Sequence, residues 1–374
     1  MTTAPLTPKD CARLIVKIGS SLLVDADGNV RRAWLETLVA DLDARIAAGQ
    51  QIAIVSSGAI ALGARRLKMP KGGRASLEDA QAAAATGQIA LSQCWAELLA
   101  AHGLTAAQML VTLDDLEDRR RYLNASATLD RLIGLGVVPV INENDSVATA
   151  EIRFGDNDRL AARIAQAAGA QGVILLSDVD GLYTADPARD PEAERIERVT
   201  KIDKAIMAMA GGGTSSGMGS GGMSSKIEAA QIASSAGVDL VIVSGLHDHP
   251  LARLAAGGCG TLFTAERSTR ARKAWLAGRL TVKGSVHVDA GAEKALKGGA
   301  SLLPAGAKAI EGKFARGDVL AIVGPDGVAI ARGLSEYDSQ DAERIAGKRS
   351  DALAGILGYA PRAALIHRDH LVML

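Results

Sequence analysis

The 374-residue sequence has few cysteines, few aromatic residues and no excess of either charge. Cys11, Cys94 and Cys259 lie far apart, without the spacings typical of metal sites or disulfide frameworks. Lys and Arg number 42 and so do Asp and Glu, so no net field favours nucleic acid or an anionic membrane. The apolar runs are shorter than the ~18 residues that span a bilayer, and the N-terminus lacks a secretory signal pattern. We therefore expect a cytoplasmic protein with reduced thiols and no membrane contact.

Two familiar nucleotide-binding patterns are not supported either. No G-x-x-x-x-G-K-[ST] segment occurs, which excludes a P-loop. Gly217, Gly219 and Gly222 match G-x-G-x-x-G, but they follow a helical stretch, whereas the dinucleotide fingerprint requires a preceding strand. The sequence therefore indicates neither a P-loop protein nor a dinucleotide-binding protein of that type.

What the chain does contain is an alternation of short apolar runs with helical patterns. Apolar residues make up 48% of the chain, dominated by small and aliphatic types, as expected of helices packed on a buried parallel sheet. Strands are predicted at residues 12–18, 51–55, 104–111, 137–141, 172–176 and 238–243. Helices are predicted between them at residues 32–48, 77–101, 121–135, 159–168 and 224–236. This order predicts an α/β fold, a three-layer αβα sandwich with a mostly parallel central sheet.

The pattern changes near residue 279. Short strand-like pieces at residues 280–282, 286–288, 319–323 and 328–331 are punctuated by Gly and Pro. That spacing predicts a small β-rich module resembling a compact barrel. We therefore predict two domains, at residues 1–278 and 279–374.

Two polar clusters follow one predicted strand. The strand at residues 137–141 ends in residues 142–145 (NEND), and residues 155–158 (GDND) precede the next helix. Polar side chains beyond a strand's carboxyl end lie where open α/β sheets bind ligands. A single cluster of this kind most often forms a turn or caps a helix, because Asn and Asp are common in both. Two clusters on one strand–loop–helix unit favour a binding site for a ligand with amino and carboxylate groups.

Two lysines stand beside small, hydrogen-bond-donating residues. Lys17 ends the first strand and is followed by residues 19–21 (GSS), while residues 56–58 (SSG) form a second such strand end. Lys226 follows the Gly-rich tract at residues 211–222 and opens a helix, where free N–H groups and a lysine bind anions. A flexible linker explains that tract about equally well. Donor-rich strand ends, two lysines and nearby Asp and Asn residues together suggest phosphoryl transfer, which needs mainly positioning and positive charge.

Histidines offer little support for a protein-held metal. His247 with His249, and His367 with His370, have suitable side chains, but no third partner is near either pair in sequence. We predict no metal site formed by the protein alone.

Five segments occur in a fixed order along the chain. They are KIGSS (17–21), VSSGAI (55–60), VPVINENDSVATAEIRFGDND (138–158), LLSDVDGLYTADP (175–187) and SGGMSSK (220–226). In this order and at this spacing they closely resemble the amino acid kinase family, and the C-terminal portion, with ASLLPAG and ILGY, resembles the PUA domain. The resemblance covers essentially the whole chain and implies the amino acid kinase fold followed by a PUA domain.

The resemblance also implies an activity. It points to transfer of the γ-phosphoryl group of ATP, with Mg²⁺, to the side-chain carboxylate of L-glutamate, the first step of proline biosynthesis. It further implies feedback inhibition by proline and a homo-oligomer, a dimer or tetramer. No general base is required, because a carboxylate is already ionised at neutral pH.

Roles for individual residues follow from the same resemblance. The implied catalytic residues are Lys17, Asp158 and Lys226, and the implied glutamate-binding residues are Ser57, Asp145 and Asn157. The implied ATP-binding residues are Lys17, Ser177, Asp178, Ser220, Gly221, Gly222, Met223, Ser224, Ser225 and Lys226.

Two alternatives stay open. Other family members act on aspartate, acetylglutamate or a nucleotide, although residues 137–158 and the C-terminal module favour glutamate. PUA domains also occur in RNA-binding and RNA-modifying proteins. Residues 280–374 hold 12 Lys and Arg against 11 Asp and Glu, whereas phosphate-backbone binding normally needs a basic face. This balance disfavours RNA binding without excluding a local basic patch.

Overall fold

The computed structural model describes residues 6–25, 28–147, 157–209, 222–265, 282–359 and 361–374. The chain forms two compact units: Met1–Glu117 with Ala125–Glu266, and Asp118–Asn124 with Arg267–Leu374. In the described ranges, no helix has both the length and the apolar character needed to cross a membrane. The domain boundary expected near residue 279 lies outside the described residues and stays a prediction.

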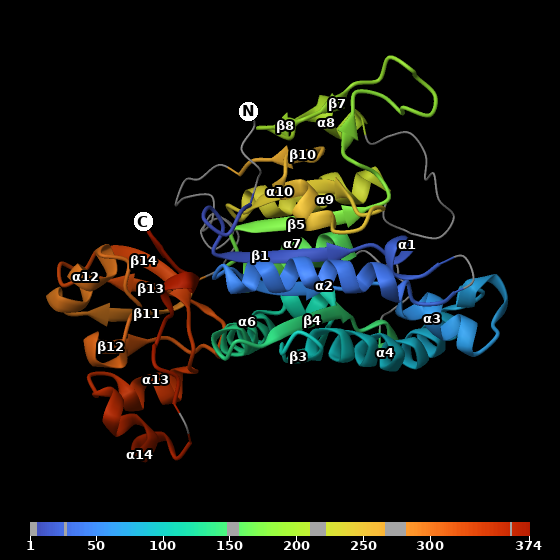
Figure 1. The fold of residues 1–374 in the computed structure, drawn as a ribbon. Coiled ribbons are helices and arrows are strands. Elements are labelled where there is room, and N and C mark those ends of the chain that lie inside the picture. The colour runs from blue at the N-terminus through green and yellow to red at the C-terminus, as the bar shows by residue number, and fades with distance from the viewer. Residues whose placement is uncertain (1–5, 26–27, 148–156, 210–221, 266–281, 360) are drawn as a thin grey trace. The chain divides into compact units, whose positions relative to one another are not determined.

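The first unit is built on an eight-stranded sheet (Figure 1) with the order β3-β4-β2-β1-β5-β9-β10-β8. Neighbouring strands are parallel except β9 and β10, which run antiparallel. The mostly parallel sheet is therefore as predicted. The strands are β1 (Arg13–Ile18), β2 (Gln51–Val55), β3 (Ala106–Val111), β4 (Val138–Glu143), β5 (Gly172–Ser177), β8 (Arg198–Val199), β9 (Asp239–Ser244) and β10 (Gly260–Phe263).

Helices lie on both faces of this sheet, because each strand sends alternate side chains to opposite faces. Alternate residues of β1, such as Leu14 and Val16, join one buried cluster with Leu38 of α2 and Trp95 of α4. Helix α7 packs on the sheet with α9 as its neighbour. This is the predicted three-layer sandwich. The helices are α1 (Ser20–Leu23), α2 (Arg32–Ala47), α3 (Ala59–Arg66), α4 (Leu77–Ala100), α5 (Leu113–Glu117), α6 (Arg119–Gly134), α7 (Asn157–Ala167), α8 (Lys204–Met209), α9 (Met223–Ser235) and α10 (Pro250–Ala255).

Helices α3 and α4 cross at unusually short range. A Cβ at Gly63 would lie 1.7 Å from the carbonyl oxygen of Ala83, and a Cβ at Gly87 would lie 1.8 Å from that of Ala59. Only glycine fits at these two positions, because backbone atoms cannot withdraw as a flexible side chain can. Since Ala59 begins α3, this crossing fixes the start of that helix and the strand end before it.

One part of the first unit differs from the sequence prediction. Residues 238–243 were expected to be the last clear strand, but β10 follows and pairs antiparallel with β9. A ribbon of β6 (Leu182–Tyr183) and β7 (Arg195–Ile196) was also not predicted. These strands have two to four residues, too few to show a hydrophobic period of their own.

The second unit has its own five-stranded sheet, in the order β12-β11-β13-β14-β15, with β11 and β13 parallel and the other neighbours antiparallel. Val286, Ile322 and Ile366 belong to a separate hydrophobic core. The predicted strand-rich module is confirmed, but residues 282–288 form one strand where two pieces were expected. The elements are β11 (Val282–Val288), α12 (Ala290–Lys297), β12 (Ala307–Glu311), β13 (Val319–Val323), β14 (Ala329–Leu334), α13 (Ser339–Ile345), α14 (Leu353–Leu357) and β15 (Leu371–Met373).

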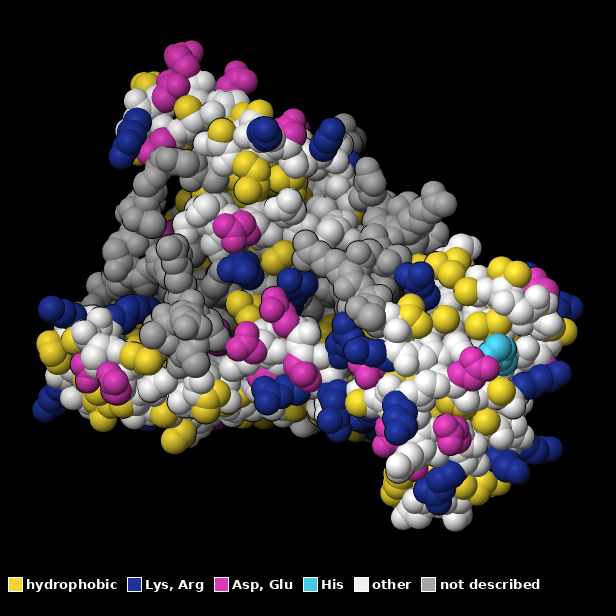
Figure 2. Space-filling model, turned by 180° about the vertical axis from the view of Figure 1, so that it is seen from behind, with side chains coloured by type: hydrophobic (Ala, Val, Ile, Leu, Met, Phe, Trp, Pro, Cys, Tyr) yellow, Lys and Arg dark blue, Asp and Glu magenta, His cyan; other side chains and the backbone are white. Residues whose placement is uncertain are grey.

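Charges of both signs are interspersed on the surface. On the face shown in Figure 2, Lys and Arg side chains and Asp and Glu side chains are both present. This distribution matches the equal totals of acidic and basic residues in the sequence.

Candidate active site

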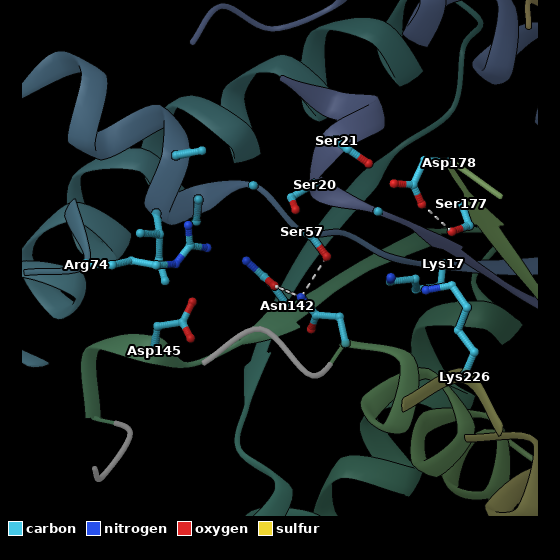
Figure 3. A pocket seen from close by; sticks show the side chains of 16 residues that line it. Lys17, Ser20, Ser21, Ser57, Arg74, Asn142, Asp145, Ser177, Asp178 and Lys226 are labelled. Atoms are coloured by element: carbon cyan, nitrogen blue, oxygen red, sulfur yellow. Dashed lines mark hydrogen bonds between the residues drawn. The ribbon is translucent and has the colours of Figure 1, made fainter. Parts of the chain in front are cut away.

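A pocket lies where the carboxyl ends of the central strands meet (Figure 3). Lys17 comes from β1, Asn142 from β4 and Ser177 from β5, while Ser57 follows β2. Strand β1 lies between β2 and β5, and the sheet extends from β1 through β2 and from β5 through β9 in opposite directions. Ligands of open α/β sheets bind at such a switch point.

One buried carboxylate joins two lysines in this region. Asp158 Oδ1 lies 2.6 Å from Lys17 Nζ, and Asp158 Oδ2 accepts a hydrogen bond of 3.1 Å from Lys226 Nζ. Asp158 is the second residue of α7, and Lys226 lies in the first turn of α9. All three residues are buried. The sheet and two helix starts therefore bring together the three residues predicted to be catalytic.

The charge state of Asp158 follows from its surroundings. Burial by itself raises the pKa of a carboxyl group. The charges and hydrogen bonds of Lys17 and Lys226 outweigh burial and hold the pKa of Asp158 below its ordinary value. Asp158 is therefore ionised at neutral pH and cannot take a proton from a substrate. It serves to fix the two ammonium groups.

Asn157 connects the neighbouring strand ends. Its Nδ2 donates to Ser57 Oγ at 2.8 Å and to Asn142 Oδ1 at 3.2 Å. Its buried Oδ1 has no hydrogen-bond partner within the described part of the chain. A buried acceptor without a partner is costly, so this oxygen suits a donor supplied by a ligand.

Two side chains of helix α4 hydrogen-bond to residues at the ends of β2 and β4. Gln88 Oε1 accepts from Asn142 Nδ2 at 2.8 Å, and Trp95 Nε1 donates to Ser56 Oγ at 2.9 Å. Ser56 and Trp95 are each wholly buried. The side chains at the ends of β2 and β4 are therefore held before any ligand binds, which reduces the entropy cost of binding.

Asp145 and Arg74 face each other on the other side of the pocket, away from Lys17 and Lys226 (Figure 3). Asp145 is 7% exposed, and its Oδ1 has no hydrogen-bond partner in the described ranges. Burial raises the pKa of Asp145 to about 6, although the charge of Arg74 opposes the rise. Asp145 is therefore mostly ionised at neutral pH, and an incoming ammonium group would relieve its unfavourable environment.

Ser177 and Asp178 line the pocket beside Lys17, and Ser177 Oγ donates to Asp178 Oδ1 at 3.0 Å. Gly222 precedes α9, and Met223, Ser224 and Ser225 form its first turn, which also carries Lys226. These four residues are not among those lining the pocket. Ser220 and Gly221 lie outside the described residues.

Some lining residues were not assigned a role from the sequence. Ser20, Ser21 and Asn142 belong to the polar segments noticed there, but Arg74 was not singled out. A compositional signal was available, because residues 65–74 contain five Lys and Arg and no acidic residue. Only the fold shows which of these cations reaches the pocket.

Comparison with known proteins agrees with this geometry. The pattern of the Amino acid kinase family matches residues 12–244, and that of the PUA domain matches residues 284–357. The glutamate 5-kinase of Sphingopyxis alaskensis is 68% identical over 367 residues, which cover 98% of this chain and 99% of that protein. The glutamate 5-kinase of Zymomonas mobilis is 65% identical over 371 residues, covering 99% and 94%. That of Novosphingobium aromaticivorans is 60% identical over 364 residues, covering 97% and 96%.

These matches extend over nearly the whole chain and include both units. The chain belongs to the amino acid kinase family and, within that family, to the glutamate 5-kinases. It is therefore a kinase with a C-terminal PUA domain, as the motifs predicted.

Proposed function

We propose that this protein transfers the γ-phosphoryl group of ATP to the side-chain carboxylate of L-glutamate, which forms γ-glutamyl phosphate and ADP. The observation that carries the proposal is the pair of lysines held by Asp158 where the central strands end. The names of relatives up to 68% identical over nearly the full chain support glutamate as the acceptor.

In the proposed reaction, one oxygen of the glutamate carboxylate attacks the γ-phosphorus, and the bond from that phosphorus to the β–γ bridging oxygen breaks. Lys17 and Lys226 would neutralise charge on the oxygens of the γ-phosphoryl group during its transfer. Asp158 would hold both ammonium groups in place. No proton has to be removed from the nucleophile, since a glutamate side chain has an ordinary pKa of about 4.3.

The polar residues farther along the pocket would hold the amino-acid end of glutamate. Asp145 and the partnerless Oδ1 of Asn157 are both acceptors suited to the α-ammonium group. Ser57 is fixed by Asn157 and would contribute a hydroxyl contact. These three residues are the ones that the family resemblance assigns to the substrate.

ATP would lie at the β5 side, with Ser177 and Asp178 near the nucleotide and residues 220–226 around its phosphates. A nucleotide-dependent kinase needs a divalent cation, and we propose Mg²⁺. In the described residues no three metal-binding side chains gather, which suits Mg²⁺ because this ion is usually held by one or two carboxylates and the phosphates themselves. Asp178 lines the pocket beside Ser177, on the side proposed for the nucleotide, and would be the carboxylate that holds the ion. When bound, the ion would neutralise phosphate charge.

The wider role rests on the family. We propose that the reaction is the first step of proline biosynthesis in the cytoplasm and that proline inhibits it by occupying the amino-acid end of the site. Substitutions in residues 143–151 should then relieve inhibition; residues 148–156 lie outside the described part of the chain. A homodimer or homotetramer is proposed on the same ground. RNA binding by the second unit is disfavoured by its balance of 12 basic and 11 acidic residues over 280–374.

A substrate panel tests the activity. The enzyme is incubated with ATP, Mg²⁺ and one of L-glutamate, L-aspartate, N-acetyl-L-glutamate or a nucleoside monophosphate. ADP release is measured for every acceptor, and any acyl phosphate is trapped by hydroxylamine as the hydroxamate. We expect L-glutamate to give hydroxamate and one ADP per hydroxamate, with the other acceptors far slower. Preference for another acceptor would refute glutamate as the substrate.

A further inference from the structure

The pocket is polarised along its length. Lys17 and Lys226 lie at one end, and Asp145 and Arg74 lie at the other, with Ser57 between them (Figure 3). An amino acid whose side-chain carboxylate points toward the lysines would place its α-carbon groups at the far end. An α-carbon carries one ammonium and one carboxylate, and the far end supplies one anion and one cation.

Local packing directs Arg74 into this pocket. Gly72 and Gly73 both have positive φ angles, 63° and 73°, which side-chain-bearing residues rarely adopt. Gly73 is buried, and a Cβ there would lie 2.8 Å from Cβ of Ala64 in α3 and 3.1 Å from Cβ of Ala83 in α4. The chain is therefore pressed against these two helices immediately before Arg74. The packing of Gly73 against α3 and α4 therefore fixes the backbone position of Arg74.

Arg74 and Asp145 face each other in the pocket, and no ion pair between them is found among the described residues. The Oδ1 atom of Asp145 is buried without a hydrogen bond. Two opposite charges that face one pocket without pairing leave both available to a ligand. A guanidinium binds a carboxylate through two parallel hydrogen bonds, which a lysine cannot reproduce.

We propose that Arg74 binds the α-carboxylate of the amino-acid substrate while Asp145 binds its α-ammonium group, so that the pair selects a zwitterionic α-carbon. The inference rests on the proposed function, since it takes the side-chain carboxylate to react at the lysine end. It adds a substrate-binding residue that lies outside the motifs of the family resemblance.

A general electrostatic effect is the competing explanation. Residues 65–74 include Arg65, Arg66, Lys68 and Lys71 as well as Arg74, and all five are exposed. Such a segment raises the local concentration of any anion. Steering of this kind would depend on total charge, whereas direct binding depends on Arg74 alone. Arg66 is the matched control, because it is exposed on α3 and does not line the pocket.

The test compares wild type, Arg74→Ala, Arg74→Lys and Arg66→Ala with L-glutamate and two competitive analogues. 4-Aminobutyrate lacks the α-carboxylate, and glutarate lacks the α-ammonium. For Arg74→Ala we expect KM for L-glutamate and Ki for glutarate to rise roughly 10- to 100-fold, the range of a charged hydrogen bond, with kcat and the Ki of 4-aminobutyrate changed less than about 2-fold. Asp145→Asn should give the reverse pattern for the analogues.

The two controls sharpen the result. Arg66→Ala should leave all constants unchanged, and Arg74→Lys should lose part of the affinity for glutamate because its ammonium lacks the guanidinium's paired donors. If Arg74→Ala proves unstable in thermal unfolding, the Arg74→Lys comparison carries the test. An unchanged KM for L-glutamate, or equal losses in Arg74→Ala and Arg66→Ala, overturns the proposal.

Failure of the proposed function would look different. In that case the wild type itself would form no hydroxamate from L-glutamate. If the wild type is active and the Arg74 variants have the same kinetic constants as the wild type, the proposed activity stands and the proposed role of Arg74 is wrong.

Discussion

Asp158 holds Lys17 Nζ at 2.6 Å and Lys226 Nζ at 3.1 Å through its two carboxylate oxygens. The three charges come from a strand and from the starts of two helices, and all three are buried. An uncompensated buried charge is costly, so each member of the triad depends on the others.

Asp158→Asn should therefore weaken both fold and catalysis. It removes the carboxylate charge that Asp158 supplies to two buried ammonium groups, and breaking a buried ion pair costs about 3–5 kcal/mol. Denaturant unfolding of the free enzyme measures this loss. In the double variant Asp158→Asn/Lys226→Met one of these charges is absent, so it should be more stable than Asp158→Asn. Strictly additive losses would show that Asp158 and Lys226 do not interact.

Asp145 gives the enzyme an acid limit. Its pKa of about 6 means that the carboxyl group becomes neutral as pH falls through 6, and a neutral group cannot hold the substrate's ammonium. We expect KM for L-glutamate to rise below pH 6, while kcat changes less. In Asp145→Asn, KM should be high at every pH and this transition should vanish. A wild-type KM that stays flat from pH 5 to pH 8 would contradict the role of Asp145.

The same carboxyl group should also cost stability. Its folded pKa, about 6, lies above the ordinary value of 3.8, so the contribution of this group to stability is most favourable below pH 3.8 and is lost as pH rises through 6. The shift of about two units corresponds to a penalty of as much as ~3 kcal/mol at pH 8. Asp145→Asn should therefore be more stable than wild type at pH 8 and similar at pH 4, by denaturant unfolding. A less stable variant at pH 8 would mean that Asp145 is well satisfied in the free enzyme.

Gly87 links helix packing to the site. Because a Cβ at Gly87 would meet the backbone of Ala59, Gly87→Ala must push α4 away from the start of α3. We expect a loss of stability of about 1–3 kcal/mol and a higher KM for L-glutamate, since Ser57 lies two residues before the start of α3. Gly134→Ala is the control, because nothing lies within 4 Å of its added Cβ. Equal stability of the two variants would refute the steric account.

The sequence was most informative about site residues that lie at the carboxyl ends of predicted strands. Lys17, Ser57 and Asp145 stand just where apolar runs end, so their convergence at one sheet edge was predictable from parallel topology. Arg74 was not, because its place depends on Gly73 packing between α3 and α4, a contact that no local pattern reveals. Strand β10 was missed for a related reason, since four residues gain their structure from pairing with β9.

The second unit should be dispensable for chemistry. Every residue with a proposed catalytic role precedes residue 245, and each unit has a hydrophobic core of its own. A chain of residues 1–278 should fold and keep kcat, with a lower melting temperature because Asp118–Asn124 group with the second unit. Hydroxamate assays and thermal unfolding on the truncated chain measure this. A soluble, folded but inactive truncation would show that the PUA domain completes the active site.

The central claim is that the two lysines stabilise the phosphoryl group in the transition state of its transfer. The variant Lys226→Met tests this claim most directly. Steady-state hydroxamate formation from ATP and L-glutamate should show kcat reduced roughly 100- to 1,000-fold, as when one transition-state donor is lost, with KM for glutamate changed only about 2-fold. Lys204→Met, which alters an exposed lysine of α8, should behave as wild type. An Lys226→Met enzyme that kept its kcat would contradict the account.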